Sequence, residues 1–488
     1  MKAKRACPVA TVATLRGPLA LRPMTDDVAF AGAARIAEMV RSKEVSPTEL
    51  VELYLERIGR IDAGLNAYRV VLAEQARADA KRAEERLAKG DEAPLLGVPV
   101  AIKDNVDYAG EVTTHGTAAY GEPAAEDGLI VRRLRDAGAA ILGKTNLPEL
   151  AIYGFTESPT WGDTRNPWDP SRTCGGSSGG SGVATAAGMC AIAHATDGAG
   201  SIRYPAAYCG LFGLKPQRNR VSLSPDREHW YGLSVSGCVS RTVTDTALYL
   251  DAMSGAERGD FDSPPPLERP LAEAARTRPG KLRIACTTKT ILPVPKADEV
   301  IAAHEETVTL LRSLGHEVTE AAPSFGRLTT DFYPLYFRGI RDEALTLPHP
   351  DRLSAQSQGF VRIGRMFSDR RLGKVRDRMR GATARIQKLW RDYDLLITPA
   401  TAQLPVEIGH WRGKGALRTI YGMSNVYPYG AAWNYTGQPA ATVPAGFTDG
   451  GLPRSVMLVA RPNDEATLIS VAAQLEAERP WADRRPPL

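Results

Sequence analysis

The stretch "GGSSGGSG" (residues 175–182) combines two residue types that contribute little to a folded core. Glycine loses more backbone freedom on folding than any other residue, and serine buries little apolar surface. A second stretch of small residues, "DGAGSIR" (197–203), follows a short apolar segment. The sequence thus places Ser177 and Ser201 in surroundings that are either flexible loops or a backbone scaffold that positions two hydroxyl groups.

Three interpretations of the first stretch compete. A flexible linker is disfavoured because "VATAAGMCAIAHA", which follows, is typical of a small-residue helix leading into a buried strand. A phosphate loop needs a G-K-[ST] lysine, and there is no lysine between Lys144 and Lys215. Gly175-x-Ser177-x-Gly179 formally fits the nucleophile elbow of α/β-hydrolase esterases, but "NPWDPSRTC" before it indicates loop and turn instead of the required strand.

The second stretch favours nucleophilic catalysis by Ser201. A serine after three small residues lets consecutive backbone N–H groups point at one spot, as an oxyanion hole requires. We predict that the N–H groups of Gly198, Ala199, Gly200 and Ser201 form this hole. The hydroxyl also needs a base, because it is a poor nucleophile until its proton is removed.

Lysine is a better candidate for this base than histidine. His194 lies in an apolar segment and is predicted to be a packed core residue. Lys103 ends the strand-like run "VPVAI", at the edge where a parallel sheet presents functional groups. Burial lowers the pKa of a lysine, so that its neutral amine can accept a proton. An exposed lysine at a strand end, without a function, is the alternative interpretation.

Strand-like and helix-like segments alternate along the chain, which predicts an α/β protein with a mostly parallel, helix-covered sheet. "SPTELVELYLERI" places Ser46, Pro47 and Glu49 as a capping box and predicts a helix that begins there. We expect one domain over residues 25–488, preceded by a disordered extension over residues 1–24.

The composition excludes several classes of protein. Of 488 residues, 43% are hydrophobic and 24% charged, as in a globular protein that is not embedded in a membrane. The 61 basic and 56 acidic residues are too balanced to predict a nucleic-acid partner. Six cysteines without a C-x-x-C pair and seven histidines without H-E-x-x-H predict neither a metal nor another cofactor. We expect a cytoplasmic protein without a membrane partner, because no apolar run reaches the roughly 18 residues of a membrane helix.

Together, "GVPVAIKDNV", "CGGSSGGSG" and "DGAGSIRYPAAYCGLFGLKP" resemble the amidase signature family. "GKTNLPEL", "GDTRNPWD" and "NYTGQPAATVPAG" occur in the matching order, so the resemblance covers most of the chain. It implies a single α/β/α domain with a large mixed, mainly parallel sheet covered by helices. It also implies hydrolysis of a carboxylic amide by a Ser–cis-Ser–Lys triad, with Ser201 as the nucleophile, Ser177 as the bridging serine after a cis bond with Gly176, and Lys103 as the base.

Other residues near the triad are expected to brace it. Ser178, Asp197 and Arg203 are predicted to act in this way. The chain carries Gly198 and Ala199 where the family commonly reads D-T-G-G-S, which counts against one subfamily more than against the activity.

The resemblance also limits the substrates and partners. We expect a free-standing hydrolase of small, aryl or oligomeric amides, with a second copy of the chain retained as a candidate partner. The alternative is the A subunit of a glutamine-dependent aminoacyl-tRNA amidotransferase. A non-catalytic binding module is disfavoured because the lysine and both serines are present.

Aromatic residues in two variable segments predict an apolar pocket for the acyl or aryl group. They are Phe332, Tyr333, Tyr336, Phe337, Trp411, Tyr421, Tyr427, Tyr429 and Trp433.

Overall fold

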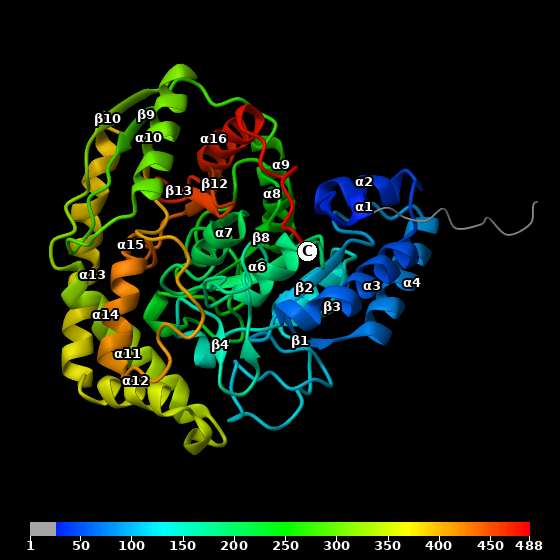
Figure 1. Cartoon of the computed structure of the whole chain (residues 1–488), viewed down its shortest axis with the longest axis horizontal. Coiled ribbons are helices and arrows are strands. Elements are labelled where there is room, and N and C mark those ends of the chain that lie inside the picture. Colours follow the sequence, from blue (N-terminus) through cyan, green and yellow to red (C-terminus); the bar gives the residue numbers. More distant parts are fainter. Residues whose placement is uncertain (1–25) are drawn as a thin grey trace, which may run out of the picture.

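One large sheet organises the protein, of which the computed structural model describes residues 26–488 (Figure 1). The predicted extension over residues 1–24 lies outside the described residues. The sheet has eleven strands, and strands from both ends of the chain belong to it. This continuity supports the single domain that we propose for residues 25–488. In spatial order the strands are β1 (Tyr68–Val71), β3 (Ala140–Thr145), β2 (Pro99–Lys103), β6 (Ile192–Asp197), β8 (Val235–Ser240), β7 (Phe212–Lys215), β12 (Ala440–Phe447), β13 (Pro453–Ala460), β11 (Leu395–Pro399), β9 (Arg283–Cys286) and β10 (Glu317–Glu320).

The sheet is mixed, as predicted, and its two kinds of pairing occupy different places. Parallel pairs lie towards the two flanks, where β2 pairs with β3 and β6, and β9 pairs with β10 and β11. The central strands from β6 to β11, and the edge strand β1, pair antiparallel. A short turn joins β12 to β13, and such a turn connects only antiparallel strands. The parallel pairing expected from the alternation of strands and helices is therefore confined to the flanks.

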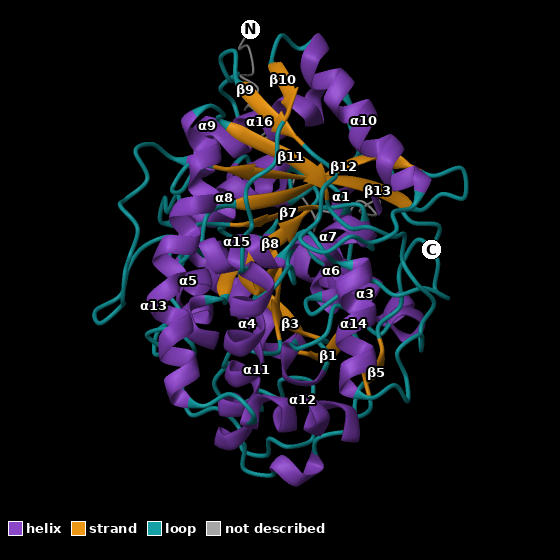
Figure 2. Ribbon diagram, turned by 90° about the vertical axis from the view of Figure 1, so that its left-hand side faces the viewer, coloured by secondary structure: helices purple, strands orange, loops and turns teal. Residues whose placement is uncertain are grey.

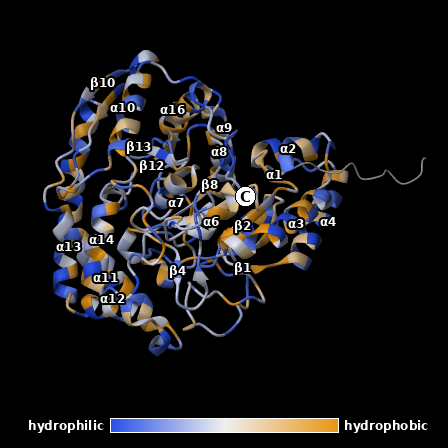
Figure 3. Ribbon diagram, in the orientation of Figure 1, coloured by the Kyte–Doolittle hydropathy of each residue, from blue (hydrophilic) through white to orange (hydrophobic). Residues whose placement is uncertain are grey.

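Helices surround this sheet, which runs as an orange band through Figure 2. They carry hydrophilic and hydrophobic residues side by side, as amphipathic covering helices do (Figure 3). The α-helices are α1 (Asp26–Ala29), α2 (Ala33–Arg41), α3 (Pro47–Leu65), α4 (Ala73–Ala88), α5 (Leu129–Asp136), α6 (Gly179–Ala186), α7 (Arg203–Cys209), α8 (Val243–Met253), α9 (Leu271–Ala274), α10 (Asp298–Ser313), α11 (Leu328–Thr346), α12 (Ala355–Arg365), α13 (Asp369–Ile386), α14 (Ala416–Val426), α15 (Ala431–Thr436) and α16 (Glu465–Glu478). Four short 3-10 helices, η1 (Glu149–Ala151), η2 (Trp230–Gly232), η3 (Pro350–Arg352) and η4 (Gln387–Arg391), and a two-stranded sheet of β4 (Glu157–Ser158) and β5 (Gly162–Asp163) complete the described elements.

Strand β13 separates two hydrophobic cores, because successive side chains of a strand point to opposite faces. Val456 and Leu458 join the core that contains residues of α8, α10 and α16. Met457 and Val459 join the core that contains residues of α11, α12 and α15. The second core is the aromatic one and lies on the opposite side of β13 from the first, whereas α7 contributes residues to both cores.

Several local predictions are confirmed. Helix α3 begins at Pro47, and Ser46 and Glu49 form both hydrogen bonds of the capping box. Strand β2 ends at Lys103, and the side chain of this lysine is fully buried, so the interpretation as an exposed strand end is wrong. None of the helices over residues 26–488 combines the length and the hydropathy that crossing a bilayer requires.

Candidate active site

Three segments distant in sequence meet at the ends of two neighbouring parallel strands. Strand β2 ends at Lys103, and β6 ends at Asp197, directly before the loop that carries Ser201. The loop before α6 brings Ser177 and Ser178 to the same place. Parallel neighbours present their carboxyl ends at one edge, which explains why residues about 100 positions apart converge here.

The amine group of Lys103 lies among three hydroxyl groups. Its Nζ is 2.8 Å from Ser177 Oγ, 3.0 Å from Ser178 Oγ and 2.9 Å from Thr196 Oγ1. Ser178, predicted to brace the site, therefore contacts the lysine directly. The structure brings together Lys103 and Ser177 as the sequence predicts, and it adds Thr196, which the sequence analysis missed.

Burial controls the charge of this lysine. Removal of Nζ from water lowers the pKa of Lys103 to about 7, although the negative charges of Asp197 and Glu343 act in the opposite direction. Burial also lowers the pKa of His194, to about 3, and the neighbouring Lys103 adds to this effect. His194 Nδ1 accepts the backbone N–H of Lys103, and Nε2 lies 3.1 Å from Ser236 Oγ. This buried, neutral histidine confirms the prediction of a core residue.

The first glycine–serine stretch is buried and contacts the second. The Gly176–Ser177 peptide bond is cis, as the resemblance implied. The backbone N–H of Ser178 donates to the carbonyl oxygen of Ser201 at 3.3 Å. A Cβ atom on Gly180 would lie 2.5 Å from the backbone of Asn146, so only glycine lets α6 approach β3 this closely. The linker interpretation is therefore wrong, because these residues are buried and fixed by contacts to neighbouring backbone.

The loop after β6 forms a compact turn around the carboxylate of Asp197. The backbone N–H of Gly200 donates to Asp197 Oδ1 at 2.6 Å, and that of Ile202 donates to Oδ2 at 3.1 Å. Including Gly200 in the oxyanion hole is therefore wrong, because the carboxylate already accepts its N–H. Within residues 26–488, the N–H groups of Gly198, Ala199 and Ser201 make no hydrogen bond to the protein.

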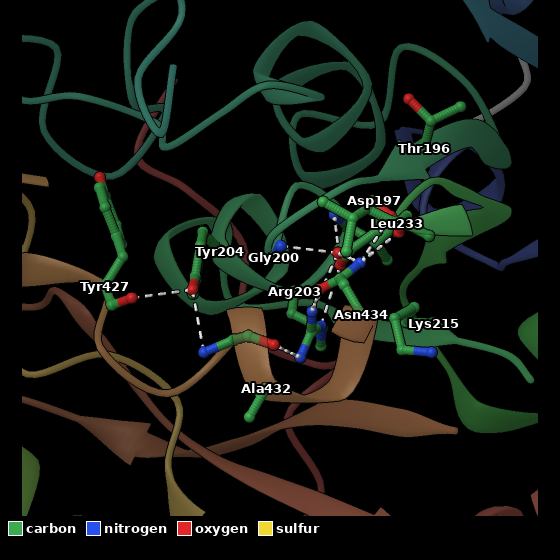
Figure 4. A network of polar contacts seen from close by, with 12 residues as sticks. Thr196, Asp197, Gly200, Arg203, Tyr204, Lys215, Leu233, Tyr427, Ala432 and Asn434 are labelled. Carbon is green, nitrogen blue, oxygen red and sulfur yellow. Dashed lines mark hydrogen bonds and ion pairs between the residues drawn. The ribbon is translucent and has the colours of Figure 1, made fainter. Parts of the chain in front are cut away.

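Gly200 has a steric role in the same turn. Its φ is +131°, and a Cβ atom would lie 2.1 Å from the ring of Tyr204. The Tyr204 hydroxyl donates to Tyr427 O and accepts the N–H of Gly430, as Figure 4 shows. Gly200 thus allows the ring of Tyr204, whose hydroxyl is held by these two hydrogen bonds, to lie against the loop.

A buried ion pair supports the loop from behind (Figure 4). Arg203 donates to both carboxylate oxygens of Asp197 at 2.9 Å, and both side chains are fully buried. Asn434, in α15, donates to Asp197 Oδ1 at 2.9 Å. Burial would raise the pKa of Asp197, but Arg203 and Asn434 outweigh it and lower this pKa to about 2. Asp197 and Arg203, for which we predict a bracing role, thus contact each other, and Asp197 contacts the backbone of the loop.

Replacing Asp197 by Ala is expected to lower the free energy of unfolding by about 3–5 kcal/mol. The substitution leaves the buried Arg203 charge uncompensated and removes the acceptor of two backbone N–H groups. Urea unfolding of the purified variant measures the change. Glu38→Ala is the matched control, because both members of its ion pair with Arg35 are exposed and its loss is expected to leave the stability nearly unchanged. Equal stability of the two variants would contradict the role of Asp197.

An apolar cavity of about 120 Å³ lies against Ser201. Within the described residues its lining contains no charged side chain, and Tyr153, Trp230 and Met423 belong to it. Four of the predicted aromatic residues also line it: Phe332, Tyr333, Tyr336 and Tyr427. The other predicted aromatics do not line it: Phe337, Trp411, Tyr429 and Trp433 are packed in the core, and Tyr421 is exposed. The sequence thus predicted the character of this pocket and about half of its aromatic wall.

A second cavity, of about 340 Å³, lies against Ser177 and Thr196. Ala151 and Trp230 line both cavities, so the cavities are neighbours. The apolar cavity reaches Ser201, and the second cavity reaches Ser177. None of the charged residues of the second cavity was predicted from the sequence. Single polar residues from separate loops carry no spacing pattern that could have identified them.

Comparisons with known proteins agree with this fold. Residues 49–469 match the sequence model of the Amidase family, which is most of the chain. The chain therefore belongs to the amidase signature family and is a hydrolase of amide C–N bonds.

Relatives of this chain are named as amide-cleaving enzymes. It is 50% identical over 463 residues to a Mycobacterium tuberculosis protein named as amidase AmiB2, covering 94% of this chain and 98% of that protein. It is 36% identical over 478 residues to the 6-aminohexanoate-cyclic-dimer hydrolase of Paenarthrobacter ureafaciens, covering 93% of this chain and 95% of that protein. The solved structure of a 6-aminohexanoate cyclic dimer hydrolase with its substrate superposes with a TM-score of 0.86 at 32% identity, covering 94% of this chain and 99% of that chain.

Proposed function

We propose that this amidase cleaves its substrate through an acyl-enzyme on Ser201, with Ser177 and Lys103 as the proton relay. The observation that carries the proposal is the contact of 2.8 Å between Lys103 Nζ and Ser177 Oγ, made by a fully buried amine. With a pKa of about 7, much of Lys103 is neutral at physiological pH and can act as a base.

The hydrogen-bond directions support the step of the relay between Ser177 and Lys103. Ser178 Oγ donates to the carbonyl oxygen of Thr196 at 3.1 Å, so towards Lys103 it can only accept. Thr196 Oγ1 also lies at hydrogen-bond distance from Nζ, at 2.9 Å. A neutral amine has two hydrogens and one lone pair. If Ser178 and Thr196 accept the two hydrogens, the lone pair points at Ser177 and can take its proton.

The chemical steps follow from this arrangement. Lys103 takes the proton of Ser177, Ser177 takes that of Ser201, and Ser201 Oγ adds to the amide carbonyl carbon. The N–H groups of Gly198, Ala199 and Ser201 stabilise the resulting oxyanion. The C–N bond then breaks, while the leaving nitrogen receives a proton through Ser177. Water hydrolyses the ester on Ser201 by the same route and releases the carboxylic acid.

The apolar cavity suggests the class of substrate. We infer an uncharged aliphatic or aryl acyl group, since the cavity beside Ser201 offers aromatic and aliphatic side chains and, within the described residues, no charge. Small, aryl and oligomeric amides meet this requirement. The relatives named as amidase and as cyclic-dimer hydrolase favour this assignment over the A subunit of an amidotransferase.

Labelling with a fluorophosphonate, followed by peptide mapping, tests the nucleophile. The reagent is expected to modify Ser201 in the unmodified enzyme and to leave the Ser201→Ala variant unlabelled. The reaction requires an activated hydroxyl beside an oxyanion hole, which only one of the two serines is proposed to provide. An adduct on Ser177 would instead support the nucleophile elbow of an α/β-hydrolase.

A further inference from the structure

The larger cavity differs from the apolar one in charge. Three carboxylates line it, those of Asp107, Asp226 and Glu343. Its lining also contains the imidazoles of His115, His194 and His229, but no lysine or arginine from the described part of the chain. His194 is fixed by its backbone and serine contacts, so the other imidazoles and the carboxylates determine the charge of this acidic chamber.

Glu343 is the buried carboxylate of the acidic chamber. Its side chain is 12% exposed, whereas Asp107 and Asp226 are exposed residues. Trp230 Nε1 donates to its Oε2 at 2.8 Å, His229 Nε2 lies 3.6 Å from the same oxygen, and His115 Nδ1 lies 3.3 Å from Oε1. These contacts direct the carboxylate but leave acceptor capacity on Oε1.

The stability of α11 does not explain why a carboxylate occupies position 343. Glu343 lies in the last turn of α11, where a negative charge is disfavoured by the helix dipole. Two of its neighbours, His115 and Trp230, have positive φ values of 48°, a conformation that costs free energy for residues with a Cβ atom. Such strain persists where the surrounding structure imposes it, and it is concentrated at functional sites.

The position of the two serines distinguishes the two cavities chemically. Ser201, which keeps the acyl group, lines the apolar cavity, whereas Ser177, which returns a proton to the leaving nitrogen, lines the acidic chamber. We therefore infer that the acidic chamber receives the amine part of the substrate, and that Glu343 selects leaving amines that carry a second, cationic group. This inference rests on the proposed function, because it uses the roles given to Ser201 and Ser177.

Three substrates with one scaffold test the inference on the unmodified enzyme. The first is the N-pentyl amide of hexanoic acid, which is neutral. The second replaces the terminal methyl group of the pentyl chain by an ammonium group. The third carries the ammonium group at the end of the acyl chain instead. Assays at about pH 8.5 keep the ammonium groups of the substrates charged.

The enzyme is expected to hydrolyse the second substrate with a kcat/KM about tenfold or more above that of the first, as a charge-assisted hydrogen bond provides. The third substrate is expected to be the poorest, because its charge would enter the apolar cavity. Glu343→Gln should remove the preference for the second substrate over the first. Glu343 also raises the pKa of Lys103, but this affects all substrates alike and cancels in the ratio.

Glu228→Gln is the matched control, since Glu228 lies next to His229 in sequence and pairs with Arg376 outside the acidic chamber. It should retain the full preference. Equal rates for the first two substrates, as expected if the chamber admits only water, or a preference for the third, would overturn the inference. Both are measured on the unmodified enzyme, so a variant that fails to fold does not prevent the test. Hydrolysis that persists in Ser201→Ala would instead refute the proposed function.

Discussion

Replacing Ser201 by Ala is expected to lower kcat for amide hydrolysis by about 10⁴-fold to 10⁶-fold. The variant keeps the apolar cavity and the N–H groups of Gly198 and Ala199, but it has no oxygen that can form the acyl-enzyme. Only binding and oxyanion stabilisation would then accelerate the reaction. Initial-rate assays with an aryl amide, over a range of enzyme concentrations, measure the loss.

A matched serine substitution controls for preparation and folding. Ser313 lies at the exposed end of α10, far in sequence from the site, and Ser313→Ala should retain the activity of the unmodified enzyme. The two variants are also expected to unfold at similar temperatures, because Ser201 makes no side-chain hydrogen bond within the described residues. If Ser201→Ala kept a tenth of the activity, another residue would have to be the nucleophile.

Replacing Lys103 by Met is expected to lower kcat/KM by about 10³-fold or more, the contribution of a base that activates the nucleophile. Methionine has a similar length and tolerates burial, so the fold should persist.

Lys103 also predicts a pH dependence of the unmodified enzyme. Below its pKa of about 7, Lys103 is protonated and cannot act as a base. The kcat/KM of the unmodified enzyme should therefore fall about tenfold per pH unit below this value and level off above it.

Measuring kcat/KM from about pH 5 to about pH 9 checks both statements. Lys103→Met should lose this pH limb together with the activity. Lys144→Met provides the comparison, because Lys144 is also fully buried, on the neighbouring strand, but pairs with Asp104 at 2.9 Å. Lys144→Met should keep the fall of kcat/KM at low pH. A profile of the unmodified enzyme that is flat across pH 7 would exclude Lys103 as the base.

The sequence predicted the parts of the site that depend on short segments. The strand that ends at Lys103, the cis bond before Ser177 and the bracing pair of Asp197 and Arg203 each follow from neighbouring residues or from quoted motifs. The loop at Gly200 shows the limit of this approach. Three small residues before a serine permit a set of parallel N–H groups, but the orientation of the Asp197 carboxylate decides which of them remain free.

Other features depend on contacts between distant segments and had no local pattern. Thr196 looks like an ordinary strand residue, and its contact with Lys103 appears only when β2 and β6 pair. The central strand β8 reads "VSGCVS", whose small polar residues lack a hydrophobic alternation although all six are buried. Glu343 and His115 are 228 positions apart, and only the folded chain brings their side chains together. The antiparallel pairing at the centre of the sheet could not be predicted either, because it depends on which strands are joined by short turns.

The amide of Asn434 reaches Asp197 across 237 positions of the chain. During translation, a growing chain therefore exposes its future nucleophile long before the support of that nucleophile has been synthesised. Hydrolytic competence should appear abruptly and late, when the final strands join the sheet, so that incomplete chains on the ribosome are inactive.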